Sequence, residues 1–500
     1  DGYRPDGDAF FALGGGDILG LPIPFIIFVV LSIIAAVVLK RSVYGRQLYA
    51  VGGNERAAML TGLDVDRLKI SVYVMSSVLA GLAGIIEVSY LSSAISNQGM
   101  GKELSVIAAA VIGGTNLSGG AVPLEGGIVL CTVRMDRIKH LDPVDMYAVV
   151  EPGVIIEDLN RRAGEHGLIY PPDPGSVATA TMGGSVAECS GGLRGLKYGV
   201  TRDYVLGLEV VLADGRVVRL GGRTIKNVTG YDLVRLFVGS EETLGVITEI
   251  TARLIPAPET SATFLATFDD LGWAGRAVAD IVGAGVLPAT LEIMDDYTLA
   301  CVEEHAALGL PTDAAALLLI EVDGPRETVE REASTVEEVC ARAGARSVQR
   351  ARDQTERDRL WAARRAALPA LARRRPVTIL EDITVPRSKV AEMLTFIRET
   401  ASRYGLEIGT FGHAGDGNLH PTILVDAVDD RVEAAVRDLV GRALALGGTL
   451  SGEHGIGMAK APFLAEELGR DGLALTSTIK RALDPLNILN PGKFAGRWRG

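Results

Sequence analysis

The chain has 500 residues, more than one hydrophobic core usually serves, so two or three domains are expected. Its formal charge of −12, with scattered basic residues, argues against nucleic acid as a partner. The 4 cysteines show no Cys-x-x-Cys spacing, which argues against a zinc ribbon, an iron–sulfur cluster or a disulfide framework and fits a reducing compartment.

Two long apolar runs dominate the first part of the chain. Residues 18–39 are nearly all apolar and are followed by a basic pair, and this length spans a bilayer as a helix. A signal peptide would have its basic residues before the apolar run. The second run, residues 70–91, carries Gly81, a small residue suited to helix–helix contact in lipid. We therefore expect two transmembrane helices, at about 18–39 and 70–91.

The segment between these runs is basic, and the positive-inside tendency places it on the cytoplasmic side of a bacterial inner membrane. Since the chain begins with Asp1 rather than Met, we also expect a fragment or a processed product. The basic residues of the segment are Lys40, Arg41, Arg46, Arg56, Arg67 and Lys69.

The same region resembles a transporter family. "YGRQLYAVGGNERAAMLTGLDVDRLK" and "GMGKELSVIAAAVIGGTNLSGG" are similar to the C-terminal part of the permease subunit of ribose-type sugar ABC transporters. The resemblance covers residues 15–120 and implies a cytoplasmic loop that docks on an ATPase subunit. Most of the permease helices have no counterpart here, and two helices cannot line a translocation path. We expect residues 1–119 to be a partial permease.

From residue 120 onward, β-rich runs alternate with glycine clusters, and the periodicity favours strands over long helices. The stretches "YPPDPGSVATATMGGSVAECSGG" and "GYDLVRLFVGSEETLGVIT" place glycine close to serine or threonine. Backbone N–H groups and hydroxyls in such stretches can approach a pyrophosphate without obstruction. Ordinary turns are the alternative for any one cluster, but several in succession favour an extended nucleotide cofactor.

These stretches resemble the FAD-binding domain of the vanillyl-alcohol oxidase type, and most closely the glycolate oxidase catalytic subunit and the D-lactate and D-2-hydroxyglutarate dehydrogenases. The resemblance covers residues 120–500, with an FAD-binding domain over 120–258. No histidine stands at the family's covalent-linkage position, which implies non-covalent FAD. The resemblance implies that the cofactor is surrounded by Thr115, Leu117, Ser118, Gly119, Gly120, Pro152, Gly153, Pro172, Asp173, Ser176, Thr181, Gly183, Gly184, Ala187, Gly191, Gly192, Tyr198, Gly199, Gly245, Val246, Ile247, Asn490 and Lys493.

Two departures from the family pattern matter. Glu242 stands where the family has the glycine of Ser-Glu-Gly-Thr-Leu-Gly. The family's pyrophosphate loop, Arg-Gly-x-Gly-Thr-x-Leu-Ser-Gly-Gly-Ala, keeps only its second part here, because Val111 and Ile112 replace Arg-Gly. Permease sequence precedes it in place of the first β-α-β unit. We interpret the chain as a chimera in which the two patterns meet at a shared Gly-Thr-x-Leu-Ser-Gly-Gly segment.

Residues 259–500 predict an α+β cap with strands packed under helices. An amphipathic helix is expected near 273–284, a strand at "AALLLIEVDG" and a charged helix over 327–343. "LWAARRAALPALARRR" predicts a basic helix with mostly solvated arginines. Arg364 is the exception, because the resemblance places it at the substrate carboxylate, which a guanidinium can bind in a bidentate manner.

Two glycine-rich segments hold 3 of the 6 histidines: "GHAGDGNLH" over residues 412–420 and "SGEHG" over residues 451–455. Two imidazoles and a carboxylate that converge are a plausible set of ligands for a divalent metal. The resemblance assigns His413, His420 and Glu453 as metal ligands, His454 as the catalytic base, and Asn418 as a residue near the substrate. The metal is expected to be Zn, Mn or Fe.

The resulting hypothesis is FAD-dependent oxidation of a small 2-hydroxy acid of the D-lactate or glycolate type. The electron acceptor is expected to be a quinone, a cytochrome or an iron–sulfur subunit. The flavoenzyme part is expected in the cytoplasm, although an even number of membrane spans would return it to the outside. The alternatives are a sugar ABC permease component, a non-functional permease–flavoenzyme fusion, or a membrane-tethered flavoenzyme that reduces quinone.

Overall fold

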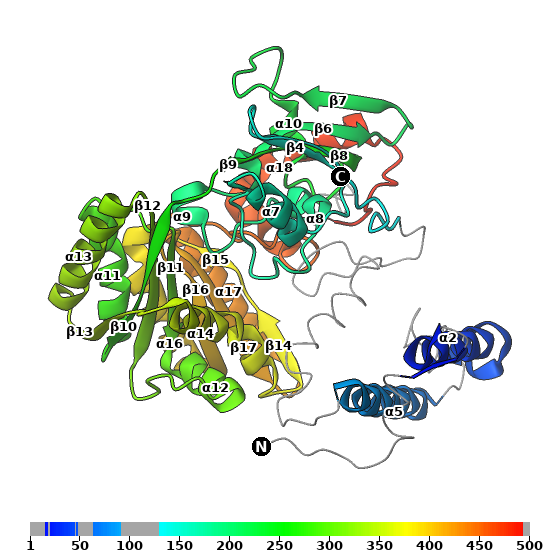
Figure 1. The fold of residues 1–500 in the computed structure, drawn as a ribbon, viewed down its shortest axis with the longest axis horizontal. Coiled ribbons are helices and arrows are strands. Elements are labelled where there is room, and N and C mark those ends of the chain that lie inside the picture. The colour runs from blue at the N-terminus through cyan, green and yellow to red at the C-terminus, as the bar shows by residue number, and fades with distance from the viewer. Residues whose placement is uncertain (1–15, 19–20, 46, 49–63, 92–129, 494–500) are drawn as a thin grey trace. The chain divides into compact units, whose positions relative to one another are not determined.

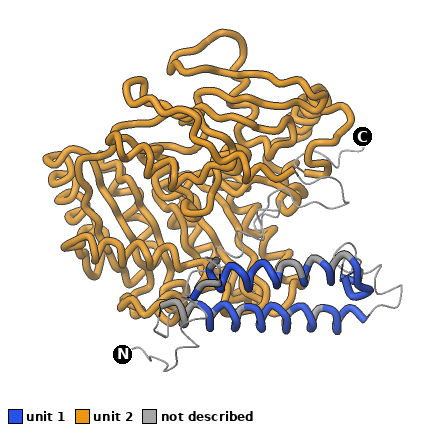
Figure 2. Tube along the Cα trace, turned by 45° about the vertical axis from the view of Figure 1, so that its right-hand side comes forward, with its two compact units in different colours: residues 1–109 blue, residues 110–500 orange. Residues whose placement is uncertain are grey.

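The computed structural model describes residues 16–18, 21–45, 47–48, 64–91 and 130–493. The chain divides into two compact units, residues 1–109 and residues 110–500 (Figure 2).

The first unit contains two helices, α2 (Ile23–Arg41) and α5 (Val65–Leu91). Both apolar runs are thus helical, as predicted. Within the described ranges, however, no helix combines the length and the hydropathy that crossing a membrane requires. Of the membrane spans expected at 18–39 and 70–91, the described residues therefore show the helices only. The first helix, α2, starts after Pro22, later than the predicted residue 18.

The second helix, α5, starts at Val65, before the predicted residue 70. A short antiparallel pair, β1 (Asp17–Ile18) and β2 (Leu21–Pro22), precedes α2.

An antiparallel five-stranded sheet organises the first part of the second unit (Figure 1). Its order is β3-β4-β8-β6-β7, so β8, a late strand, lies between β4 and β6. Short helices connect the strands, which the strand-rich prediction did not include. The elements are β3 (Ile138–Asp142), β4 (Tyr147–Val150), α7 (Ile156–Gly164), β5 (Leu168–Ile169), α8 (Met182–Glu188), α9 (Gly195–Tyr198), β6 (Val205–Val211), β7 (Val217–Gly221), α10 (Leu233–Phe237), β8 (Val246–Arg253) and β9 (Ile255–Pro256).

A larger antiparallel sheet forms the second part, in the order β13-β10-β12-β11-β16-β17-β14, with β15 also paired to β17. Its elements are β10 (Thr260–Phe268), α11 (Leu271–Gly283), β11 (Thr290–Asp295), α12 (Asp296–Ala306), β12 (Ala316–Gly324), α13 (Arg326–Arg342), β13 (Ala345–Arg350), α14 (Gln354–Arg365), α15 (Ala367–Ala372), β14 (Val377–Leu380), β15 (Ile383–Thr384), α16 (Val390–Tyr404), β16 (Glu407–His413), β17 (Asn418–Val425), α17 (Asp430–Ala445) and α18 (Leu464–Leu483).

Both faces of this sheet are covered. Along β12, Leu318 and Ile320 pack in the core that includes α11, α13, α16 and α17, whereas Leu317 and Leu319 pack with α12, α14 and α15. Successive side chains of a strand point to opposite faces, so a strand buried on both sides is continuously apolar. The near-continuous apolar run of β12 follows from this arrangement.

The predicted helices at 273–284 and 327–343 are confirmed as α11 and α13. The expected basic helix is instead two helices, α14 and α15, joined at Ala366. The last long helix, α18, returns to the first sheet, where Ile479 and Leu483 pack against its core.

Candidate active site

The hairpin of β16 and β17 places two histidines on one face. His413 pairs with Asn418 and Phe411 pairs with His420. Because positions two apart on a strand face the same way, His413 and His420 share a side of the sheet. Their rings meet edge to face, with centroids 5.3 Å apart, and both side chains are buried.

A loop that follows α17 brings the carboxylate to this pair. Glu453 Oε1 lies 3.1 Å from His413 Nε2 and 3.3 Å from His420 Nε2. The loop approaches very closely: a Cβ at Gly452 would lie 2.3 Å from Asn418 Nδ2. Only glycine fits at that position, so the Ser-Gly-Glu-His sequence is explained by packing against the β16–β17 hairpin.

Behind His413 stands a second carboxylate that the sequence analysis did not single out. Glu292, on β11, lies 2.7 Å from His413 Nδ1 and accepts a hydrogen bond of 2.5 Å from Arg364 Nε. Arg364 also lies over the Phe411 ring, 4.8 Å from its centroid. The structure therefore shows Arg364 holding Glu292 in place, and its contact with a substrate carboxylate stays a prediction.

His454 stacks on His420, with ring centroids 5.1 Å apart and an interplanar angle of 14°. Its backbone N–H donates to Asp382 Oδ2 at 2.9 Å. Asn418 donates to Asp382 Oδ1 at 2.6 Å rather than facing an open space. Lys460 Nζ completes the group, 3.5 Å from Asp382 Oδ2.

The electrostatics of these groups are set by burial and by their partners. Burial opposes a charge on His413, but the carboxylates of Glu292 and Glu453 outweigh it and raise its pKa to about 10. Burial likewise opposes ionisation of Glu453, yet His413 and His420 hold its pKa well below the ordinary value. For His454, burial dominates and lowers the pKa, so this ring is neutral at pH 7 and can accept a proton.

This donor set fits a divalent metal ion. One ligand atom each of His413, His420 and Glu453 can be chosen so that all three lie within 4.8 Å of one another. Two imidazoles and one carboxylate with open positions suit non-haem iron, manganese or zinc. Glu292 on His413 Nδ1 is the carboxylate partner that metal-bound histidines commonly have. A metal ion would replace the proton that His413 otherwise carries.

The residues expected around FAD fall into several groups in the structure. Pro152 and Gly153 form the turn before α7, and Gly183 packs on it so closely that a Cβ would lie 2.5 Å from Pro152 Cβ. Thr181 caps α8 by accepting a hydrogen bond from Gly184 N, and Ala187 is buried in the same helix.

The second group of residues expected around FAD contacts residues of the larger sheet and its loops. A Cβ at Gly191 would lie 2.9 Å from Glu453 Oε2, so this glycine cluster directly contacts the candidate metal ligand. Gly192 packs on the backbone of Asp173, which follows Pro172. The hydroxyl of Tyr198 donates to Asp323 of β12 at 2.8 Å.

Other expected FAD residues are more scattered. Ser176 lies in an exposed turn, and Gly199 packs on Asp203. Ile247, on β8, is fully buried in the core next to Val246 and Gly245, so its side chain serves packing. Asn490 donates to Glu241 O at 2.6 Å, and Lys493 is buried. Thr115, Leu117, Ser118, Gly119 and Gly120 lie outside the described residues.

A pocket of about 290 Å³ lies beside the site and is lined by residues of both parts, among them Glu188, Glu241, Gly452 and Glu453. Glu188 Oε2 is buried and has no hydrogen-bond partner within the described chain. Burial, together with Glu241 and Glu242, raises the pKa of Glu188 to about 8, so at pH 7 it can donate an O–H. A buried donor without a partner fits the carbonyl and ring-nitrogen acceptors of a flavin.

Family comparisons agree with this geometry. Residues 257–494 match the model for the FAD-linked oxidases, C-terminal domain, and residues 102–221 match an FAD binding domain. Glycolate oxidase subunit GlcD of Bacillus subtilis is 52% identical over 385 residues, 76% of this chain and 82% of the relative.

The chain belongs to the FAD-linked oxidases.

A second relative within the family is a D-lactate dehydrogenase of Archaeoglobus fulgidus, 40% identical over 76% of this chain and 84% of the relative. Among solved structures, 4-ethylphenol oxidase from Gulosibacter chungangensis superposes with a TM-score of 0.61 at 21% identity, over 79% of this chain and 88% of that one. That likeness confirms the vanillyl-alcohol oxidase type of fold and the α+β class expected from the sequence.

The N-terminal part has a different match. Residues 6–133 match a permease component of branched-chain amino acid transport systems. This confirms the resemblance to a permease, although the description names amino acids rather than sugars. The permease and FAD-binding matches overlap over residues 102–133, which contain the segment that the two patterns share.

Sequence reasoning missed Glu292, Asp382 and Lys460. A signal for the two acids was present: Glu292 stands within the apolar strand "TLEIMD", and Asp382 stands between the apolar strands β14 and β15 in "TILEDIT". A carboxylate in a strand that is covered on both faces must be paired. Lys460 gave no such signal, because it lies in an irregular loop.

Glu242 gives a testable departure from the FAD-linked oxidases. Its backbone has a φ of 51°, the left-handed region that glycine favours. Burial raises the pKa of its carboxyl to about 7. We expect Glu242→Gly to increase the free energy of unfolding by about 1 kcal/mol, since the left-handed strain is removed. The midpoint of urea denaturation measures this.

The gain in the free energy of unfolding from Glu242→Gly should depend on pH. Glu242 takes up its proton near pH 7 when folded and near 4.5 when unfolded, so the folded chain binds more protons between these values. The native protein therefore loses stability as pH rises through this window, and the advantage of Glu242→Gly is larger at the upper end. Glu241→Gly is the matched control: its φ is 52°, but its carboxylate accepts from Ile456 N at 2.6 Å, so this change should destabilise. A less stable Glu242→Gly would refute the argument.

Proposed function

We propose that the chain oxidises a small 2-hydroxy acid of the D-lactate or glycolate type to the 2-oxo acid. The observation that carries the proposal is the convergence of His413, His420 and Glu453 beside a neutral, buried His454. The names of the relatives, a glycolate oxidase subunit and a D-lactate dehydrogenase, support this substrate class.

Each residue of the site has its own role in the proposed reaction. His413, His420 and Glu453 would hold a divalent ion, Zn, Mn or Fe, and neutral His454 takes the proton of the substrate hydroxyl. Arg364 steadies the cluster through Glu292 and would bind the substrate carboxylate with its remaining donors. Asn418 donates to Asp382, whose other oxygen accepts from the loop that carries the base. Non-covalent FAD, when bound, supplies the hydride acceptor, and a metal ion, when bound, supplies charge stabilisation to the ionising hydroxyl.

The domain assignment that goes with this function is a partial permease over 1–119, a truncated FAD-binding domain over 120–258 and a substrate and metal domain over 259–500. The residues named above around FAD would line the cofactor. The electron acceptor would be a quinone, a cytochrome or an iron–sulfur subunit. The permease match favours a second possibility for residues 1–119, docking on an ABC ATPase subunit, and stimulation of such an ATPase by this chain would support it.

Flavin bleaching tests the proposed reaction. The FAD-loaded chain is mixed under anaerobic conditions with glycolate, D-lactate or L-lactate, and the loss of flavin absorbance is followed. We expect glycolate or D-lactate to bleach the flavin at least about tenfold faster than L-lactate, because a fixed base and carboxylate site admit one hydrogen orientation. A loaded chain that no 2-hydroxy acid bleaches would refute the proposal.

A further inference from the structure

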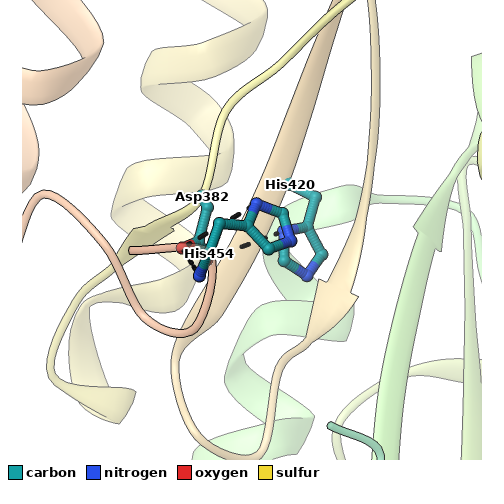
Figure 3. Close-up of side chains that lie close together, drawn as sticks. All are labelled: Asp382, His420 and His454. Atoms are coloured by element: carbon teal, nitrogen blue, oxygen red, sulfur yellow. Dashed lines mark hydrogen bonds and ion pairs between the residues drawn. The ribbon is translucent and has the colours of Figure 1, made fainter. Parts of the chain in front are cut away.

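The loop over residues 451–457 carries both Glu453 and His454, and its first half is held from the larger sheet. The fully buried Asp382 accepts three hydrogen bonds there through Oδ2, from Ser451 Oγ at 2.7 Å, Glu453 N at 3.0 Å and His454 N at 2.9 Å. Figure 3 shows Asp382 beside the ring of His454, whose Nδ1 lies 3.9 Å from Oδ2. Asp382 therefore anchors the loop on one side.

The second half of the loop is held from the other part of the unit, by Glu241. This carboxylate accepts from Ile456 N at 2.6 Å and from Gly457 N at 3.1 Å through Oε1, and from Gly457 N at 3.0 Å through Oε2. The loop passes so close that a Cβ at Gly455 would lie 2.9 Å from Glu241 Oε1. One buried carboxylate from each part of the unit thus holds the same loop.

The backbone of Glu241 is itself fixed in an unusual conformation. Its φ of 52° lies in the left-handed region, which an L side chain adopts only at a cost. Its N–H donates to Ala187 O at the end of α8 at 2.8 Å, and its C=O accepts from Asn490 Nδ2 at 2.6 Å. Such a conformation persists where the surroundings determine it, and it is often found at functional sites. The segments that fix Glu241 are those expected around FAD.

We propose that Glu241 is a positioning residue for the loop that carries Glu453 and His454. Asp382 holds residues 451–454 and Glu241 holds residues 456–457, so the turn that presents the ligand and the base is fixed at both ends. Metal and catalytic groups need to be held to within about 0.5 Å, and a loop fixed at one end does not provide this. The consequence for metal and base rests on the proposed function, whereas the hold on the loop does not.

Amide hydrogen exchange of the full chain, resolved to single residues, tests the clamp without metal, FAD or turnover. In Glu241→Ala, amides 456–457 lose their acceptor and should exchange faster. Amides 453–454 are bonded to Asp382 instead, yet they should also exchange about tenfold faster or more, because the loop opens as one unit. Faster exchange at amides 456–457 alone would overturn the proposal.

Binding of Mn²⁺, followed by the EPR signal of the free ion, tests the consequence for the candidate metal site. His413→Asn shows whether the ion occupies that site. Glu241→Ala should weaken Mn²⁺ binding about tenfold to a hundredfold, the usual effect of losing a group that orients a ligand. Glu241→Gln keeps an oxygen that can accept from both amides, so its affinity should stay within about threefold of the native value. A folded Glu241→Ala with native Mn²⁺ affinity would contradict the proposal.

The matched control is Glu303→Ala. Glu303, on α12, also accepts from two backbone N–H groups of a loop, Gly309 N at 3.0 Å and Leu310 N at 2.8 Å. That loop carries none of the residues of the candidate site. The change should raise exchange at Gly309 and Leu310 and leave both Mn²⁺ affinity and the exchange of residues 451–457 at their native values.

The native chain decides if Glu241→Ala does not fold. After correction for intrinsic rates, its amides 453–454 and 456–457 should exchange within about tenfold of one another, as expected for one cooperative unit. A larger difference would overturn the positioning role. A native chain that binds no Mn²⁺ would refute the metal site of the proposed function and leave hydrogen exchange to decide. A clamped loop in an FAD-loaded chain that oxidises no 2-hydroxy acid would refute the proposed function alone.

Discussion

Purified as it stands, the chain should carry FAD at well below one molecule per polypeptide. The family pattern places Arg-Gly at the start of the pyrophosphate loop, where this chain has Val111 and Ile112. Each lost charge-assisted hydrogen bond is worth roughly 1.5–3 kcal/mol. Since about 1.4 kcal/mol is tenfold in affinity, two lost bonds weaken FAD binding by roughly a hundredfold or more. The ratio of flavin to protein absorbance measures the content.

Replacing the N-terminal segment tests whether the incomplete pyrophosphate loop causes the weak FAD binding. Residues 1–119 are replaced by the corresponding leading segment of the Bacillus subtilis relative, which the family pattern predicts to supply the β-α-β unit and the complete loop. We expect one FAD per grafted chain. The control deletes residues 1–109 only, which removes the first compact unit without restoring the loop, and it should stay flavin-poor. Full flavin content in the unaltered chain would refute the expectation.

His454→Asn should have the second large effect. In the grafted chain, loss of the base should lower the rate constant of flavin reduction by roughly a hundredfold to ten-thousandfold, the range typical of general acid–base catalysis. KM should change little, because the proton transfer belongs to the transition state rather than to binding. Stopped-flow reduction by D-lactate and glycolate measures both quantities.

The matched control is His166→Asn, which changes an exposed histidine outside the site. It should reduce the flavin at the native rate. Flavin reduction by His454→Asn within about tenfold of the native rate would remove this residue from the role of base. FAD content is measured in each variant, so that a loss of cofactor is not mistaken for a loss of chemistry.

Much of this site could be predicted from the sequence because its chemistry is concentrated in two short segments. His413, His420 and Glu453 stood out by residue type and glycine context, and the structure brings them together. The long periodic elements α11 and α13 were also predictable, since amphipathic spacing is a local property.

What could not be predicted depends on contacts between distant segments. Glu292 and Asp382 act on histidines that are far away in the chain, and only the order of strands in the sheet brings them near. Arg364 shows the same limit: the sequence could not reveal that Glu292 already engages it.

The hairpin of β16 and β17 also constrains how this segment can vary in length. Four residues, Ala414 to Gly417, connect His413 to Asn418. Because strand side chains alternate, inserting or deleting one residue here would turn His420 toward the opposite core, whereas a change of two would preserve its direction. Insertions and deletions in this connection should therefore be tolerated in pairs, provided that glycine is kept at Gly417, where a Cβ would lie 1.9 Å from Val385 O.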